Sequence, residues 1–297
     1  MLKQTVLKTK EYIVSQLEYV TDSPSFEANE ILIYATGIKR SKLLFKKDEC
    51  LSFLQKLRVK KMVAQRRAGI PLQYIIGEWE FFGINFKVGK GVLIPRADTE
   101  LSVETAVEYL SSLSQNPTVY DFCAGSGAIG ISVSVNFPTA QVIMVEKSKK
   151  AFKYLRKNLE INSKNGKLNA VAIREDIFKF NPKKKCDLLI SNPPYIKSDV
   201  MKSLSKEVKR EPKMALDGGK DGLDFYKGIC ERADKYLKTG GKLIFEIGYD
   251  EAADVLKIME QNGFVNIEIL KDLCGNDRVV TGDFQPSIKT EGKNIYG

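Results

Sequence analysis

The sequence contains no histidine, and this absence narrows the chemistry that the chain can perform. Histidine is the commonest general base at neutral pH, so the Ser-His-Asp and Cys-His nucleophile systems are excluded. The five cysteines are scattered and form no Cys-x-x-Cys pair. This spacing favours reduced thiols and argues against a zinc site, so we expect no metal. Any reaction must rely on carboxylates, amides, backbone groups and a cofactor.

Long apolar runs are also missing. No stretch approaches the length of a membrane span, and no apolar core follows residues 1–5 as it would in a signal peptide. With 43% hydrophobic and 28% charged residues, the composition is that of an ordinary globular protein. We therefore expect a cytoplasmic protein without membrane contact.

The net charge of +10 comes mostly from lysines that are spread along the chain. A basic surface favours encounter with acidic or nucleic-acid-bearing partners. A lysine-rich solvated surface explains the same charge equally well, and arginine would be expected at sites that read bases. Direct contact with nucleic acid therefore stays open.

Residues 1–80 show helical periodicity and predict a small helical bundle. One helix carries the apolar residues between Val6 and Val20. A second begins at Pro24 and ends at Gly37, and a third ends at Gly69. Residues 81–96 alternate like strands and predict a β-hairpin that joins two domains, with Val92 to Pro95 in its second strand.

Strands and helices alternate from residue 97 to residue 284. Strands are expected near 118–122, 141–145, 169–173, 186–191, 241–247, 264–270 and 278–282. Helices are expected near 99–113, 128–136, 148–162, 222–238 and 250–261. This alternation predicts an α/β domain with a doubly wound parallel sheet and an antiparallel edge at its C-terminus. Residues 285–297 are polar and patternless, and we expect a flexible tail.

A glycine-rich turn follows the first strand of this sheet and opens a helix. Small residues let such a turn approach a ligand closely, and the helix N–H groups then face an anion. The candidate residues here are Asp121, Cys123, Ala124, Gly125, Ser126 and Gly127. Glycine-rich turns after strands are common, so this signal alone is weak.

The next three strands also end in polar groups. Glu146 follows the second strand, where an acid can hold ribose hydroxyls. Asp176 follows the third and can accept from an adenine amino group, while Ile177 packs on the ring. Asn192 ends the fourth. Each acid alone is explained as a solvated residue, but four groups at the carboxyl edge of one sheet favour a ligand site.

The fourth strand ends in the tetrad Asn192, Pro193, Pro194 and Tyr195. A residue before a proline is driven to an extended conformation, and proline has no N–H to continue the ladder. The tetrad therefore predicts a stiff edge that presents the Asn192 amide and the Pro193 carbonyl, and this pair can hold a substrate –NH2 group. A rigid strand-to-loop turn is the simpler explanation of the tripeptide alone.

These motifs resemble those of Rossmann-like, S-adenosylmethionine-dependent methyltransferases, and the tetrad resembles that of enzymes that methylate a planar amide or amine nitrogen. Longer stretches are similar to the HemK/PrmC family, the protein-(glutamine-N5) methyltransferases of peptide chain release factors. These stretches span residues 71–78, 80–83, 93–100, 211–224 and 277–279. The resemblance covers nearly the whole chain.

The resemblance implies a seven-stranded class I methyltransferase sheet with S-adenosyl-L-methionine as cofactor. The protein substrate would be a class I release factor, methylated on the glutamine of its Gly-Gly-Gln motif, which modulates translation termination. The helical domain would dock the release factor. Asp121 and residues 123–127 would hold the methionine end, Glu146 the ribose, and Asp176 with Ile177 the adenine. Asn192 would also contact the cofactor.

The catalytic residues implied by the resemblance are Asn192, Pro193, Pro194 and Tyr195, which would also bind the glutamine side chain. Asn192 Oδ1 and the Pro193 carbonyl would accept both amide hydrogens, and Tyr195 would pack on the flat amide. One position departs from the family pattern, because Cys123 stands where glycine is frequent. A related family that acts on a ribosomal protein often has cysteine there, so cofactor binding is still expected.

Three alternatives share part of this pattern. A ribosomal-protein glutamine methyltransferase would use the same chemistry on another partner. A DNA adenine-N6 methyltransferase would share the tetrad and the basic charge, but it needs a base-flipping pocket, and no long insertion supplies one. A non-catalytic cofactor- or RNA-binding module would keep the fold without turnover.

Overall fold

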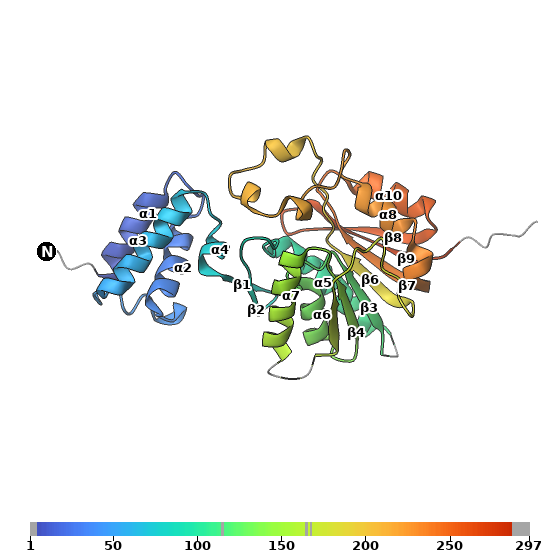
Figure 1. Ribbon diagram of the computed structural model, residues 1–297, viewed down its shortest axis with the longest axis horizontal. Helices are drawn as coiled ribbons and strands as arrows, with labels where there is room; N and C mark the ends of the chain where they lie inside the picture. Colours follow the sequence, from blue (N-terminus) through green and yellow to red (C-terminus); the bar gives the residue numbers. More distant parts are fainter. Residues whose placement is uncertain (1–4, 114–115, 164–165, 167, 287–297) are drawn as a thin grey trace, which may run out of the picture. The chain divides into compact units, whose positions relative to one another are not determined.

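The computed structural model describes residues 5–113, 116–163, 166 and 168–286 (Figure 1). The chain forms two compact units. The helical unit contains Met1–Trp79, Val88–Lys90 and Leu204–Glu211, and the sheet unit contains Glu80–Lys87, Gly91–Ser203 and Pro212–Gly297. Both units are therefore discontinuous in sequence. Most of the predicted tail, residues 285–297, lies outside the described residues.

The helical unit contains α1 (Val6–Leu17), α2 (Pro24–Thr36), α3 (Phe53–Arg67) and the short α4 (Leu72–Ile76). The predicted start at Pro24 is confirmed, and Gly37 caps α2 in the left-handed conformation, φ 75°. A capping box between Ser52 and Gln55 begins α3. Apolar faces of the first three helices meet in one buried cluster, which is the bundle that the periodicity predicts.

A buried arginine organises the polar contacts of this unit. Arg66 Nε and Nη2 donate to the two carboxylate oxygens of Glu27 at 2.6 and 3.0 Å. Arg66 Nη2 also donates to Glu207 Oε1 at 2.6 Å. The Arg66 side chain is only 2% exposed. Glu207 is 141 positions away in sequence, so the arginine ties segment Leu204–Glu211 into the helical unit.

The β-hairpin exists, but its predicted position is wrong. Its strands are β1 (Glu78–Phe81) and β2 (Ile84–Lys87), so it starts before residue 81. Phe82 and Gly83 both have positive φ, 50° and 70°, as a two-residue hairpin turn requires. The stretch from Val92 to Pro95 is not a strand, and its buried apolar side chains pack in the sheet unit instead.

The sheet unit contains a seven-stranded sheet, as predicted. Its order is β5-β4-β3-β6-β7-β9-β8. The strands are β3 (Thr118–Phe122), β4 (Gln141–Val145), β5 (Ala170–Ile173), β6 (Cys186–Ser191), β7 (Leu237–Glu246), β8 (Phe264–Lys271) and β9 (Asp277–Phe284). The first five are parallel, and β9 pairs antiparallel with β7 and β8. The strand order reverses beside β3, between β4 and β6.

Helices cover both faces of the sheet (Figure 1). One buried cluster joins the sheet to α5 (Glu100–Ser111), α6 (Ala128–Asn136) and α7 (Lys149–Asn162). The other joins it to α8 (Asp224–Cys230), α9 (Ala233–Tyr236) and α10 (Ala252–Gln261). The single helix predicted over 222–238 is wrong: α8 and α9 are separate, and Leu237 already pairs with Cys186 in the sheet. None of the described helices is long and apolar enough to cross a bilayer.

Candidate functional site

One cavity of the sheet unit lies at the carboxyl ends of β3, β4 and β6 and beside the segment that follows β5. Nine of the predicted site residues line it: Cys123, Ala124, Gly125, Ser126, Glu146, Asp176, Ile177, Asn192 and Pro194. Counted out to open solvent, it holds about 1050 Å³ of empty space. The groups that the sequence placed at four strand ends therefore do converge. Asp121, Gly127, Pro193 and Tyr195 are not among the lining residues.

The turn after β3 is tight because glycine occupies its left-handed positions. Gly125 and Gly127 have φ of 55° and 83°, and the Gly127 N–H donates to the Ala124 carbonyl at 2.7 Å. A Cβ on Gly127 would lie 2.4 Å from Leu155 Cδ1. Glycine is therefore required here both for the backbone conformation and for the close approach of α7. The turn exposes Ala124, Gly125 and Ser126 to the cavity.

Cys123 also has a left-handed backbone, with φ 59°. This conformation costs an ordinary residue about 1–2 kcal/mol, which explains why glycine suits the position. The chain accommodates the side chain at the cavity wall. Burial, aided by the charges of Glu146 and Asp121, raises the pKa of the Cys123 thiol well above its ordinary range. The thiol therefore stays protonated and does not act as a nucleophile.

Asp121 supports the turn from beneath instead of lining the cavity. Its side chain is fully buried, and Oδ2 accepts a hydrogen bond from the Gly130 N–H at 2.9 Å. Oδ1 is buried and has no hydrogen-bond partner among the described residues. Burial raises the pKa of Asp121 to about 8, against the Gly130 hydrogen bond and with help from the charge of Glu146. The Asp121 side chain therefore fixes the first turn of α6 through Gly130, while burial of its ionised form lowers the stability of the fold.

Glu146, at the end of β4, is held by two backbone groups. Its Oε2 accepts from the Gly125 N–H at 2.8 Å, and its Oε1 accepts from the Ser148 N–H at 2.6 Å. Burial raises its pKa, although these N–H groups oppose the rise. The carboxylate therefore fixes the glycine-rich turn, and each oxygen keeps a second lone pair for a ligand hydroxyl.

The far wall of the cavity is partly charged and partly aromatic. Asp176 accepts from the Phe178 N–H at 3.1 Å and pairs with Lys147 at 2.9 Å. Burial is the largest single influence on the pKa of Asp176 and would raise it, but the hydrogen bonds from Lys147 and the Phe178 N–H, together with the charges of Lys147 and Lys179, lower it overall. Ile177 is 4% exposed, and the rings of Phe178 and Phe225 lie 5.7 Å apart beside it. This wall combines a hydrogen-bond acceptor with apolar surface, as a flat heterocycle requires.

Asn192 follows β6 and faces the cavity from the other side. Its Nδ2 donates to Thr99 Oγ1 at 3.3 Å. Pro193 and Pro194 are buried. The residue after the tetrad, Ile196, is hydrogen-bonded to a second loop. Its N–H donates to the Leu216 carbonyl at 2.8 Å, and its carbonyl accepts from the Gly218 N–H at 2.9 Å. The tetrad therefore leads into a hydrogen-bonded segment, and the stiffness expected from its prolines stays a prediction.

Burial raises the pKa of Tyr195 to about 12, so the phenol is neutral near pH 7. Because Tyr195 does not line the cavity, its packing on a substrate amide stays a prediction.

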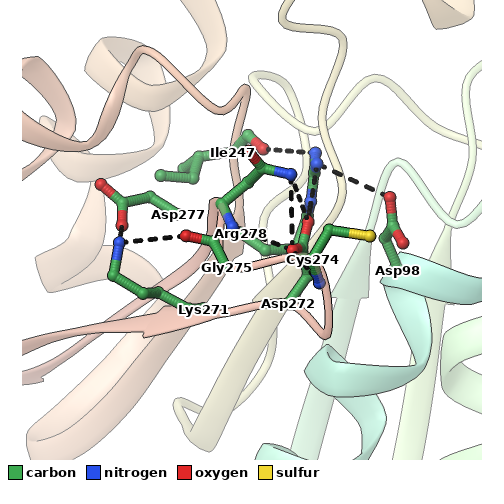
Figure 2. A network of polar contacts seen from close by, with 9 residues as sticks. Asp98, Ile247, Lys271, Asp272, Cys274, Gly275, Asp277 and Arg278 are labelled. Carbon is green, nitrogen blue, oxygen red and sulfur yellow. Dashed lines mark hydrogen bonds and ion pairs between the residues drawn. The ribbon is translucent and has the colours of Figure 1, made fainter.

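Sequence reasoning missed a polar cluster behind Asn192. Thr99 lines the cavity, and Glu246 ends β7 with only 2% of its surface exposed. Arg278, on β9, donates to Asp272 Oδ2 at 3.1 Å and to the Ile247 carbonyl at 3.2 Å, and it lies 3.6 Å from Asp98 Oδ2. Figure 2 shows Arg278 joining these groups.

This network ties the 3-10 helix Ala97–Thr99 to the end of β7. Glu246 is the last residue of β7 and lies inside the strand predicted over residues 241–247, so a rule that looks just beyond each predicted strand does not select it.

Comparison with known proteins matches both units. Residues 102–220 match the Methyltransferase small domain family, and residues 11–77 match the PrmC N-terminal domain family. A release factor glutamine methyltransferase of Thermodesulfovibrio yellowstonii is 39% identical over 256 residues, which cover 86% of this chain and 90% of that protein. A protein of the same name from Fusobacterium nucleatum is 38% identical over 272 residues, which cover 91% and 75%.

Solved structures support the fold. A methyltransferase from Pyrococcus furiosus has a TM-score of 0.50 and 19% identity, covering 69% of this chain and 91% of that chain.

Proposed function

This chain belongs to the family of release factor glutamine methyltransferases, and we propose that it methylates the side-chain amide nitrogen (N5) of a glutamine in class I peptide chain release factors. The methyl donor would be S-adenosyl-L-methionine, and the target would be the glutamine of the Gly-Gly-Gln motif. The observation that carries this proposal is one cavity that joins the glycine-rich turn, two acids and Asn192 at a single sheet edge.

The cavity residues fit S-adenosylmethionine. The turn at residues 124–126 offers close backbone approach, and Glu146 has lone pairs for the ribose hydroxyls. Asp176, Ile177 and the neighbouring aromatic rings suit the adenine. The carboxylates of Glu146 and Asp176 in the wall also favour a ligand that carries positive charge. When bound, the cofactor supplies a methyl group on a sulfonium.

Asn192 and Pro193 would then position the substrate. An amide nitrogen is a poor nucleophile because its lone pair is delocalised into the carbonyl. Asn192 Oδ1 and the Pro193 carbonyl would accept its two hydrogens and aim the nitrogen at the methyl group. These two acceptors would hold the nitrogen in place while it exchanges one proton, released to solvent, for the methyl group that the cofactor would supply. Positioning of this kind is worth up to roughly 7–11 kcal/mol of the barrier.

The helical unit would supply the contact with the release factor, since it matches the N-terminal domain of this family and contains no part of the cavity. An enzyme with this substrate would work where translation occurs, which is consistent with a cytoplasmic location.

The test is methyl transfer from radiolabelled S-adenosylmethionine to purified release factor, beside the same factor with its Gly-Gly-Gln glutamine replaced. We expect label on the first protein alone. The Asn192→Ala variant should bind the cofactor with unchanged affinity by calorimetry and lose nearly all turnover. Label on ribosomal protein or DNA instead would reject the proposed substrate, and near-normal turnover of Asn192→Ala would reject the proposed mechanism.

A further inference from the structure

Glu246 is a buried carboxylate directly behind the proposed substrate site. It ends β7, and its side chain is hydrogen-bonded by the side chains of both Thr99 and Asn192. Its Oε2 meets no hydrogen-bond partner among the described residues. Thr99 is 4% exposed, so bulk water does not compete for these bonds. The three side chains form a closed group of donors and acceptors whose directions can be worked out.

An ionised carboxylate can only accept hydrogen bonds, so Asn192 must turn its Nδ2 group toward Glu246. Nδ2 also donates to Thr99 Oγ1 at 3.3 Å, which leaves the Thr99 hydroxyl proton for Glu246. Both hydrogens of Nδ2 then have acceptors. The Asn192 Oδ1 is the one polar atom of that amide left for a ligand.

We propose that Glu246, together with Thr99, is a positioning residue that fixes the orientation of the Asn192 amide and leaves Oδ1 to accept from the substrate –NH2 group. The reverse orientation would present Nδ2 to the cavity, and a donor there would repel an amide nitrogen. Glu246 therefore selects for a substrate that donates hydrogen bonds. This inference rests on the proposed function, because it assigns a role at the same site.

The pKa of Glu246 reflects opposing effects of burial and of its polar and charged neighbours. Burial raises its pKa to about 7, the Thr99 and Asn192 hydrogen bonds and the Arg278 charge oppose the rise, and Asp98 adds to it. Two phenols, Tyr195 and Tyr226, also face it from the segment after β6 and from α8. Protonated Glu246 becomes a donor and can bond Asn192 Oδ1 instead. The positioning effect should therefore weaken as the pH falls below about 7.

The experiment compares Glu246→Gln with the wild-type chain in release-factor methylation from pH 5.5 to 8.5. Glutamine keeps the shape but can donate or accept, so it no longer forces one orientation on Asn192. We expect kcat at pH 8 to fall by about 100-fold, the scale of a misplaced reacting group. The KM for S-adenosylmethionine should change by less than about twofold, and the loss of activity toward acid pH should disappear.

Glu251→Gln is the matched control. Glu251 is also buried, and its pKa is also raised to about 7 by burial. Its carboxylate accepts from the Gly248 N–H at 2.9 Å and from the Tyr226 hydroxyl at 3.2 Å, not from Asn192. In this variant, activity should still fall toward acid pH as in the wild-type chain (the acid limb of the pH profile), and kcat at pH 8 should fall little. An acid limb that vanishes in Glu251→Gln and persists in Glu246→Gln would overturn the proposal.

Thr99→Val gives an independent test that does not alter any charge. It preserves the shape of a buried side chain and removes the hydroxyl, so we expect kcat to fall about 10-fold or more at unchanged cofactor affinity. Wild-type kcat in both Glu246→Gln and Thr99→Val would refute the positioning role. A wild-type chain that fails to label any release factor would instead refute the proposed function, so the two failures are distinguishable.

Discussion

Replacing Asp121 by asparagine should stabilise the fold, and most strongly at alkaline pH. The wild-type carboxylate is fully buried and has one oxygen without a partner among the described residues. Its pKa rises from 3.8 in the unfolded chain to about 8 in the fold. The folded state therefore holds a proton that the unfolded state releases, and stability falls as the pH rises between these two values.

The magnitude follows from the size of this interval. At about 1.4 kcal/mol per pH unit, the buried carboxyl costs about 5–6 kcal/mol above pH 8 and about 1–2 kcal/mol at pH 5. In the Asp121→Asn variant, the new side-chain carbonyl can still accept from the Gly130 N–H. The new NH2 group then takes the unpartnered position, which costs about 1–3 kcal/mol. The net gain should be about 2–5 kcal/mol at pH 8.5 and near zero at pH 5.

Urea unfolding of both chains at pH 5, 7 and 8.5 measures this difference. Asp176→Asn is the control at the cavity rim, because the pKa of Asp176 is lowered and its removal should give no gain at pH 8.5. The reasoning fails if Asp121→Asn is no more stable than wild type at pH 8.5. It also fails if the two chains lose stability in parallel between pH 5 and pH 8.5.

Gly127→Ala should lose about 2–5 kcal/mol, because its Cβ would lie 2.4 Å from a leucine methyl in a left-handed backbone. Gly240→Ala has a similar φ, +77°, and open space, so it should lose only about 1–2 kcal/mol in the same urea unfolding. Equal losses would contradict the packing argument. Arg66→Ala leaves Glu27 buried without its partner and should lose about 3–5 kcal/mol by calorimetry. A loss below about 1 kcal/mol would show that this ion pair contributes little.

The parallel strands and the site residues that follow them were predictable because both follow from local pattern. Buried runs such as residues 186–191 have no polar alternation, and a parallel sheet collects their carboxyl ends at one edge. The hairpin was misplaced because Phe82 supplies a left-handed turn position, which a bulky residue rarely does. The helix over 222–238 was overextended because its apolar spacing continues into a residue that pairs in the sheet.

The cluster of Thr99, Glu246 and Arg278 was missed for a different reason. Its members come from three segments that are more than 30 positions apart, and each is an ordinary residue in its own neighbourhood. The register of β7 against β9, which sets Glu246 opposite Val279, brings Glu246 and Arg278 together, and Thr99 reaches Glu246 from the 3-10 helix Ala97–Thr99. Long-range pairing of this kind leaves no local signal in one sequence.

The chain passes between the two units five times, after residues 79, 87, 90, 203 and 211. This path has a consequence for inheritance. Recombination that exchanged residues 1–79 alone would separate Arg66 from its own Glu207 and pair it with the residue that the recipient chain carries at position 207. It would also leave Leu204–Glu211 packed against a foreign bundle. Residues 1–79 alone therefore do not make up the whole helical unit, and we expect substitutions at Arg66 and in Leu204–Glu211 to affect stability jointly.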